Sequence, residues 1–272
     1  MARGLFCPSV HFLYFYMDQG RSKDYLQWWT PWNDQSVGLL HHPQQIGTAF
    51  RVGSQYVMTA RHLFTRYQIH GNLSAMLLKS FVQFDKQKFY LKGIELENEE
   101  HDVIVFELDV PKGHQLPPPL PLMSRDQHVT NKVTILGFDG YGKKVVDNNC
   151  PTIQVSEKEC RMARQDLQKM GFRANWYNGN RYSGDWYNDL AHPHLLPLKT
   201  HLAHGASGSP VVVQYEGKPL VIAMFIKGYP EFYWDLDDTY KRRIDEKFII
   251  KAAVKLSTID MDFIADDIMD RS

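Results

Sequence analysis

Short apolar or alternating runs, separated by turn residues, recur through most of the chain. Alternation of apolar and polar side chains with a period of two is typical of strands that bury one face. The pattern predicts six strands in the first half, over residues 36–41, 47–52, 56–59, 76–84, 89–96 and 103–108. It predicts six more in the second half, over residues 132–138, 144–155, 196–202, 210–215, 220–226 and 248–254. Six strands suffice to close one small barrel, so we expect an all-β fold of two six-stranded antiparallel β-barrels.

A proline-rich segment over residues 115–124 separates the two sets of strands. Its four prolines lack backbone donors and favour an extended path. We therefore expect a linker here, between a first barrel over residues 36–114 and a second barrel over residues 125–272. Residues 1–35 precede the first predicted strand and are interpreted as an N-terminal arm.

Two helices are expected at the periphery of the second barrel. Residues 157–170 have a helical pattern that ends at Gly171, inside a surface insertion over residues 157–193. The tail predicts a C-terminal α-helix over residues 256–270, because Ser257 to Asp260 has the spacing of a capping box. The apolar residues that follow helical spacing there are Leu256, Ile259, Phe263, Ile264 and Ile268.

Charge and cysteine content narrow the class of protein. The sequence has 31 basic and 31 acidic residues, so it lacks the basic field that holds a nucleic acid as principal ligand. Its three cysteines, Cys7, Cys150 and Cys160, are too few for the disulfide bonds that stabilise a small secreted domain. An odd number also leaves at least one free thiol. Their spacing matches no zinc motif, and we expect neither a metal nor a cofactor. The oligomeric state stays open.

The apolar run over residues 5–17 is the candidate targeting segment. Pro8 and His11 interrupt it, and it is shorter than the roughly 20 residues that a membrane-spanning helix needs. No small-residue cleavage site follows it. We therefore favour an intracellular setting without a membrane span, with secretion as the alternative.

The segment 204–210, with the sequence HGASGSP, leads directly into an apolar strand. A serine between glycines can lie on a tight turn whose amides converge, because glycine permits a close backbone approach. Ser207 is thus the candidate nucleophile, and the amides of Gly205 and Ser207 form a candidate oxyanion hole. The same composition also occurs in ordinary loops.

A histidine and an aspartate in the first predicted barrel complete the candidate site. His62 follows a strand, and a neutral imidazole can take a hydroxyl proton near neutral pH. Asp102 precedes a strand and can hold the ring in the required tautomer. Each residue alone has a structural alternative, but chance accounts poorly for all three in the order His, Asp, Ser.

With these motifs the chain resembles the trypsin-like peptidase family over residues 46–254. The resemblance lies in TARH ending at His62, DVIV beginning at Asp102 and GASGSP around Ser207. It implies a serine endopeptidase that takes a protein or peptide substrate through a Ser207–His62–Asp102 triad. It also places the primary pocket around five residues, His201, His204, Phe225, Lys227 and Gly228. Histidine or Lys227 there can favour an acidic side chain, or these residues only form the rim.

Two departures from that family concern activation. Digestive members carry an aspartate just before the nucleophile that pairs with a new amino terminus, whereas this chain has Ala206. Another element must therefore order the oxyanion loop. Ser209 stands where many members have a second glycine, a variant that resembles glutamyl endopeptidases and some intracellular branches.

Two other functions compete with a peptidase. The chain can be a catalytically inactive relative whose barrels bind peptides or another protein, which reaction with a fluorophosphonate would distinguish. An α/β hydrolase fits poorly, because its nucleophile precedes the acid and the histidine and its strands alternate with helices.

Overall fold

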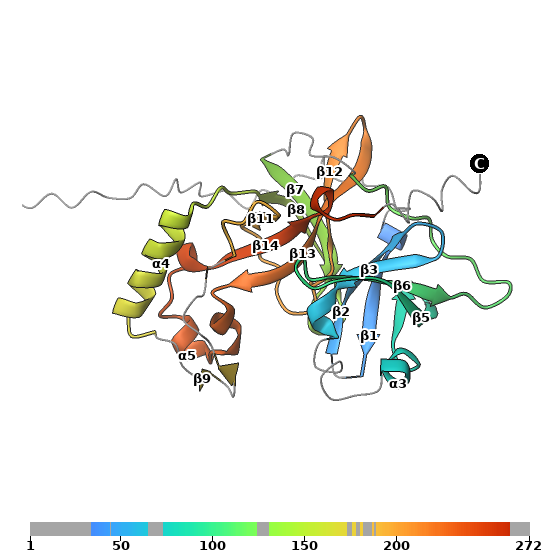
Figure 1. Cartoon of the computed structure of the whole chain (residues 1–272), viewed down its shortest axis with the longest axis horizontal. Coiled ribbons are helices and arrows are strands. Elements are labelled where there is room, and N and C mark those ends of the chain that lie inside the picture. The colour runs from blue at the N-terminus through green and yellow to red at the C-terminus, as the bar shows by residue number, and fades with distance from the viewer. Residues whose placement is uncertain are drawn as a thin grey trace, which may run out of the picture.

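The computed structural model describes residues 34–43, 45–64, 73–123, 131–172, 176–177, 180–181, 187 and 189–261. The fold is all-β, with a closed barrel and a second sheet side by side and few helices (Figure 1). The barrel consists of β1 (Val37–His42), β2 (Gln45–Val52), β3 (Tyr56–Ala60), β4 (Phe81–Phe84), β5 (Gln87–Asn98) and β6 (Val103–Asp109). Its strands are neighbours in the order β1-β2-β3-β6-β5-β4, and all of these pairs are antiparallel. The first predicted barrel is therefore present.

The strand predicted over residues 76–84 is wrong in its first half. Leu73–Leu77 form the short helix α3, and only Phe81–Phe84 pair as a strand. Met76 is buried and Leu78 is 77% exposed, so these residues do not continue one face of the sheet. Two turn hydrogen bonds, from Lys79 to Met76 and from Ser80 to Leu77, connect α3 to β4.

The second sheet is formed by β7 (Lys132–Phe138), β8 (Lys144–Pro151), β11 (Leu195–Leu198), β12 (Pro210–Tyr215), β13 (Lys218–Tyr229) and β14 (Ile250–Lys255). Its strand order is β11-β14-β13-β12-β7-β8, with β11 and β8 at the two edges. A separate pair, β9 (Trp176–Tyr177) and β10 (Asn180–Arg181), lies in the predicted insertion.

The sequence predicts a second closed barrel, but the six described strands of the second sheet do not close into one. The edges β8 and β11 meet only through one bridge, between Thr152 and Leu198. Pro151 and Pro197 stand at this junction and accept hydrogen bonds from Lys199 and Ile153 through their carbonyls. Proline has no amide to return, so a regular ladder cannot continue between these edges.

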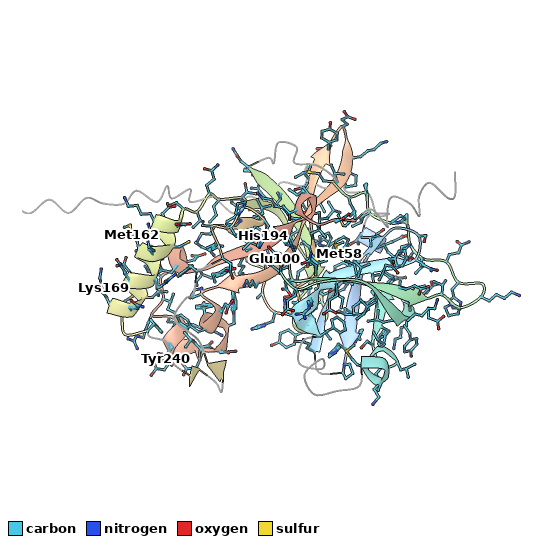
Figure 2. The ribbon with its side chains drawn as sticks, in the orientation of Figure 1. Met58, Glu100, Met162, Lys169, His194 and Tyr240 are labelled. Carbon is cyan, nitrogen blue, oxygen red and sulfur yellow. The ribbon has the colours of Figure 1, made fainter. Side chains whose placement is uncertain are left out.

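Helix α4 (Glu157–Lys169) is present where the sequence predicts it. Ser156 caps its start and forms a reciprocal capping box with Glu159. Met170 is the C-cap residue of this helix. The next residue, Gly171, has a φ of 93°, which glycine adopts without strain. Figure 2 shows Met162 and Lys169 on this helix, far from Met58 in the barrel.

The predicted C-terminal helix is only partly described. Leu256–Thr258 form a 3-10 helix, and residues 262–270 lie outside the described residues. Three further short helices follow β13, namely η3 (Glu231–Asp235), α5 (Asp238–Lys241) and η4 (Glu246–Phe248). No helix in the described part of the chain is long and apolar enough to cross a membrane.

Residues 115–123 run from the barrel to the second sheet and form backbone hydrogen bonds with both. Leu120 donates its amide to the Arg51 carbonyl in β2, and Val221 in β13 both donates to Pro121 and accepts from Met123. The Arg51 side chain is 1% exposed, and its guanidinium donates to the Pro117 carbonyl. Burial of a cation requires such partners. These hydrogen bonds therefore fix the path of the chain between the barrel and the second sheet, which are the two lobes of the molecule.

Candidate functional site

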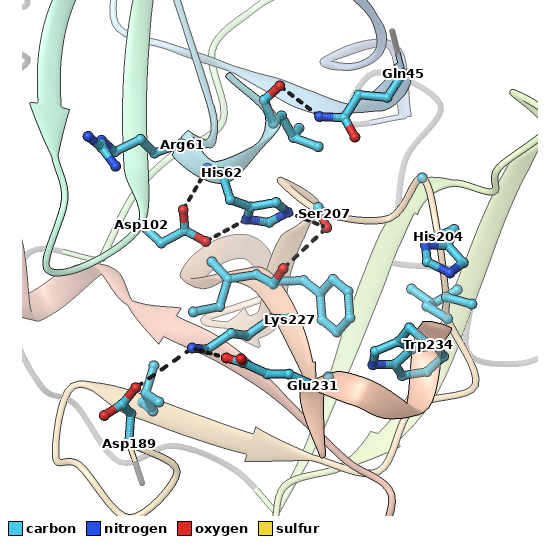
Figure 3. A pocket seen from close by; sticks show the side chains of 18 of the residues that line it. Gln45, Arg61, His62, Asp102, Asp189, His204, Ser207, Lys227, Glu231 and Trp234 are labelled. Atoms are coloured by element: carbon cyan, nitrogen blue, oxygen red, sulfur yellow. Dashed lines mark hydrogen bonds and ion pairs between the residues drawn. The ribbon is translucent and has the colours of Figure 1, made fainter. Parts of the chain in front are cut away.

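A large hollow lies between the barrel and the second sheet. It is a cleft of about 990 Å³ with walls from both lobes (Figure 3). The residues around its centre include Gln45, His62 and Asp102 from the barrel and Ser207, Phe225 and Lys227 from the second lobe. The cleft therefore unites side chains that are as much as 189 positions apart, from Gln45 to Trp234.

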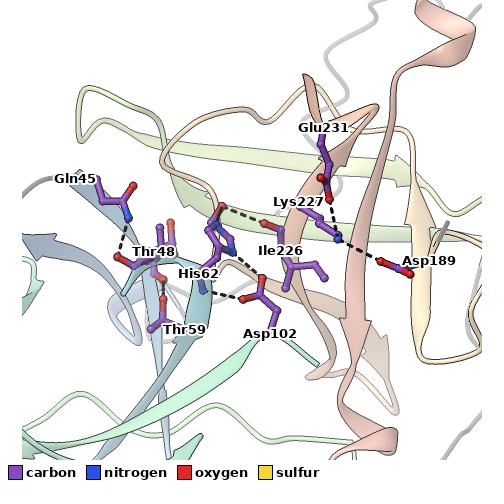
Figure 4. A network of polar contacts seen from close by, with 11 residues as sticks. Gln45, Thr48, Thr59, His62, Asp102, Asp189, Ile226, Lys227 and Glu231 are labelled. Carbon is purple, nitrogen blue, oxygen red and sulfur yellow. Dashed lines mark hydrogen bonds and ion pairs between the residues drawn. The ribbon is translucent and has the colours of Figure 1, made fainter. Parts of the chain in front are cut away.

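His62 lies in the 3-10 helix η2 (Arg61–Leu63), directly after β3, and Asp102 directly precedes β6. Strands β3 and β6 are paired, so the two residues emerge at the same end of the barrel. The His62 amide donates to Asp102 Oδ1 at 2.7 Å, and His62 Nδ1 lies 2.6 Å from Asp102 Oδ2 (Figures 3 and 4). Both carboxylate oxygens are thus occupied by the same histidine.

The backbone at Asp102 has a φ of 56°, in the left-handed region that few non-glycine residues adopt. Its carbonyl accepts from the Arg61 amide at 3.0 Å. Asp and Asn tolerate this conformation better than most residues. Left-handed backbone geometry therefore aims the carboxylate at the imidazole.

Ser207 completes the arrangement from the other lobe. Its Oγ lies 3.2 Å from His62 Nε2 and also 3.2 Å from the Ile226 carbonyl oxygen. With Nδ1–H donating to Asp102, the Nε2 lone pair faces the Ser207 hydroxyl. The three side chains that the sequence singles out therefore lie within hydrogen-bond reach of one another.

The loop that carries Ser207 depends on two glycines with positive φ. Gly205 and Gly208 both have a φ of 89°. A Cβ on Gly205 would lie 2.3 Å from the Asp139 oxygen, and one on Gly208 would lie 2.0 Å from the Thr48 oxygen. Only glycine fits at either position, so the GASGSP sequence is required by close backbone approach.

The amides of Gly205 and Ser207 have no hydrogen-bond acceptor among the described residues. The neighbouring amides do, since Ala206 donates to Ala203 and Gly208 donates to Phe225. Unpaired amides beside a serine hydroxyl can bind a developing oxyanion. The sequence predicts these two amides as an oxyanion hole, and that role stays a prediction.

Thr48 in β2 holds this loop from the opposite lobe, which sequence reasoning missed. Its amide donates to the Ser207 carbonyl, and its hydroxyl donates to the Gly205 carbonyl, both at 2.9 Å. The same hydroxyl accepts from the Phe138 amide at 3.0 Å. Thr48 is fully buried, and Thr59 donates to its carbonyl at 2.7 Å (Figure 4). These bonds order the loop that carries Ser207, where Ala206 offers no ion pair.

Thr48→Val is therefore expected to damage the loop while keeping the shape of the side chain. It removes the donor for Gly205 and the acceptor for Phe138, and each buried group left unpaired costs about 1–3 kcal/mol. We expect kcat on a peptide substrate to fall about 10- to 100-fold with a smaller change in KM. Thr48→Ser, which keeps the hydroxyl, should restore most of the rate.

A matched control for Thr48→Val is Thr134→Val. Thr134 is also buried in a strand, β7, but its hydroxyl makes only a 3.4 Å contact with the Asn148 carbonyl. Equal loss of kcat in the two valine variants would show that Thr48 acts through general stability and does not position the loop.

Four of the five residues predicted for the pocket line the cleft, namely His204, Phe225, Lys227 and Gly228. His201 does not line it. Its Nδ1 lies 3.3 Å from Asp147 Oδ2, and this ion pair raises the pKa of His201. Asp147 belongs to β8, so the pair turns the His201 side chain away from the cleft.

Lys227 carries its own counter-ions. Its Nζ lies 3.1 Å from Glu231 Oε1 and 3.7 Å from Asp189 Oδ2 (Figure 4). Burial by itself lowers the pKa of Lys227, but Tyr229 and Glu231 outweigh it and raise the pKa. Lys227 is therefore a charged but neutralised part of the wall.

Three histidines lie near Asp102, and sequence reasoning did not group them. The His194 ring centroid is 4.0 Å from that of His192 and 4.9 Å from that of His101. Figure 2 places His194 and Glu100 close together between the two lobes. Burial and then the two neighbouring histidines lower the pKa of His194. Within the described ranges, no group of histidine, cysteine or carboxylate side chains has the arrangement of a metal site.

The solved structures to which this chain is similar include two proteases of low sequence identity. A serine protease of a human pathogenic astrovirus is 14% identical with a TM-score of 0.47, and the match covers 84% of this chain and 91% of that chain. The Rv3671c protease of M. tuberculosis, in an inactive form, is also 14% identical with a TM-score of 0.47. That match covers 82% of this chain and 84% of the other. No curated protein matches the sequence.

A match to a model of a protein family identifies the family of this chain. The model, described as a trypsin-like peptidase domain, matches residues 47–224, well over half of the 272 residues. The match spans His62, Asp102 and Ser207, and it runs from within β2 of the barrel to within β13 of the second sheet. The chain therefore belongs to the trypsin-like peptidase family.

Proposed function

We propose that this chain is a serine endopeptidase that hydrolyses a protein or peptide through a covalent acyl-enzyme. The observation that carries the proposal is the short path from Asp102 Oδ2 through the His62 ring to Ser207 Oγ, with separations of 2.6 and 3.2 Å. A carboxylate, an imidazole and an alcohol in this order activate the alcohol as a nucleophile.

In the proposed reaction, Ser207 Oγ attacks the carbonyl carbon of the scissile bond while its proton passes to His62 Nε2. The carbonyl oxygen becomes an oxyanion and accepts from the Gly205 and Ser207 amides. His62 then gives its proton to the leaving amine, and the acyl group stays on Ser207. Water, deprotonated by the same ring, attacks the ester and releases the second product.

Asp102 has a positioning role in this proposal. Its Oδ2 accepts from Nδ1–H, so Nε2 is left as the acceptor that faces Ser207. Its Oδ1 accepts from the His62 amide, which fixes the backbone that carries the ring. The carboxylate also stabilises the imidazolium that forms when Ser207 gives up its proton.

An alkyl fluorophosphonate tests the proposal directly, because it phosphonylates a serine that is both nucleophilic and beside an oxyanion hole. We expect the full chain to gain one adduct, located on Ser207 by mass spectrometry of a digest. His62→Ala should lower the labelling rate about 100-fold or more, since the base is gone. A folded wild-type protein that does not react would favour the inactive binding module instead.

A further inference from the structure

Trp234 in η3 lines the same cleft as Ser207 and was not singled out by its sequence context. Its indole lies against the backbone of Gly228, since a Cβ there would be 2.4 Å from Trp234 Cζ2 and 2.6 Å from Nε1. On its other side, the His204 ring lies 5.8 Å away, edge to face. Figure 3 shows His204 and Trp234 together, across the cleft from His62. The indole therefore bridges two opposing walls.

These walls enclose the space next to the nucleophile. One wall is the segment 202–205 before Ser207, and the other is the segment 225–228 of β13. Ser207 Oγ contacts the Ile226 carbonyl, so the space opens at the hydroxyl. An acyl group on Ser207 with its oxyanion at the Gly205 amide directs the adjoining side chain between these walls. Trp234 lines that space and contacts both walls, through Gly228 and His204.

The indole is held in place from behind. Lys251 Nζ lies 5.1 Å from the centre of the Trp234 ring, in a cation–π contact, and donates to the Leu202 carbonyl. The Tyr233 ring lies 5.0 Å from the indole at nearly a right angle. Lys251 is itself only 6% exposed, so the indole packs against a buried side chain.

We propose that Trp234 closes the pocket for the residue before the scissile bond, so that glycine, alanine and serine fit there and larger side chains do not. This inference rests on the proposed peptidase function. The charges of the site point the same way, because Lys227 is neutralised by Glu231 and Asp189 and Lys251 lies behind the indole. A long acidic side chain would therefore meet a bulky ring before it reached an ammonium group.

Peptidyl diphenyl phosphonates test this with the full-length chain, because they react once with the serine and need no turnover. Two probes with the same peptide carry alanine-like or phenylalanine-like side chains at the reacting position, and the rate of Ser207 modification is measured for each. We expect wild type to react about 100-fold faster with the alanine-like probe, in line with what a few misplaced methylenes cost in a closed pocket. Equal rates, or faster reaction with the phenylalanine-like probe, would overturn the inference.

Trp234→Ala removes the obstruction, and we expect it to bring the two rates to within about tenfold by accelerating the larger probe. Tyr240→Ala, which deletes a half-exposed aromatic on α5 outside the cleft lining, should keep the wild-type ratio. A Trp234→Ala protein that still excludes the larger probe, while it reacts normally with the smaller one, would contradict the role of Trp234. If Trp234→Ala does not fold, the ratio of the two probe rates in the wild-type protein alone tests the inference.

The failure of the proposed function has a different signature. A folded wild-type chain that reacts with neither probe, nor with a small alkyl fluorophosphonate, overturns the peptidase proposal and this inference with it. Reaction with the fluorophosphonate and with both peptidyl probes at equal rates overturns only the role of Trp234.

Discussion

Ser207→Ala is expected to lower peptide turnover by about 10⁴-fold or more, which is below detection in most assays. The variant lacks the oxygen that forms the acyl-enzyme, and His62 Nε2 loses the group 3.2 Å away that it would deprotonate. The fold should survive, since among the described residues the lost hydroxyl has hydrogen-bond partners only in His62 and the Ile226 carbonyl, and the methyl group of alanine fits the same space. The measurement is cleavage of a mixed peptide pool, with products identified by mass spectrometry.

Ser209→Ala is the matched control for this loss. Ser209 lies two residues further along the same loop and is fully buried, and its Oγ has no hydrogen-bond partner among the described residues. Removing an unpaired buried hydroxyl costs little stability. Cleavage should therefore continue in Ser209→Ala, and unchanged cleavage by Ser207→Ala would refute the proposed mechanism.

The sequence pattern predicts most of the strands because each is a short apolar or alternating run bounded by turn residues. Strands β7 and β12 have the predicted limits, and β2, β3 and β6 differ by two residues or fewer at either end. The pattern does not report how sheets close. Whether β8 and β11 join depends on two prolines that meet only in the fold, Pro151 and Pro197.

Local sequence identifies only some of the residues that form the site. The motifs around His62, Asp102 and Ser207 are recognisable because glycine, imidazole and carboxylate each have a local signature. Thr48 has none, since three of its four hydrogen-bond partners lie 90 to 159 positions away and threonine in a strand is ordinary. Trp234 is similar, because its role comes from Gly228 and His204, which reach it only through the path of β13 and η3.

Asp102→Asn is the second variant with a large expected effect, because the two carboxylate oxygens have different partners. Asn has one oxygen, and it tolerates the left-handed backbone found at this position. If that oxygen keeps the 2.7 Å bond from the His62 amide, the Asn NH₂ group faces Nδ1 and donates to it. The ring must then carry its proton on Nε2, which faces Ser207 and can no longer accept.

We therefore expect Asp102→Asn to lower kcat by about 10³- to 10⁴-fold near neutral pH, with KM nearly unchanged, as a wrong tautomer does in other triads. Asp109→Asn is the matched control, since Asp109 ends the same strand, β6, at the end away from the cleft. It should retain wild-type kcat. Because the Asn variant keeps both the backbone and the volume of the side chain, a kcat within threefold of wild type would mean that the Asp102 carboxylate does not set the tautomer of His62. The fluorophosphonate labelling rate should fall in parallel with kcat, since both reactions need the same lone pair on Nε2.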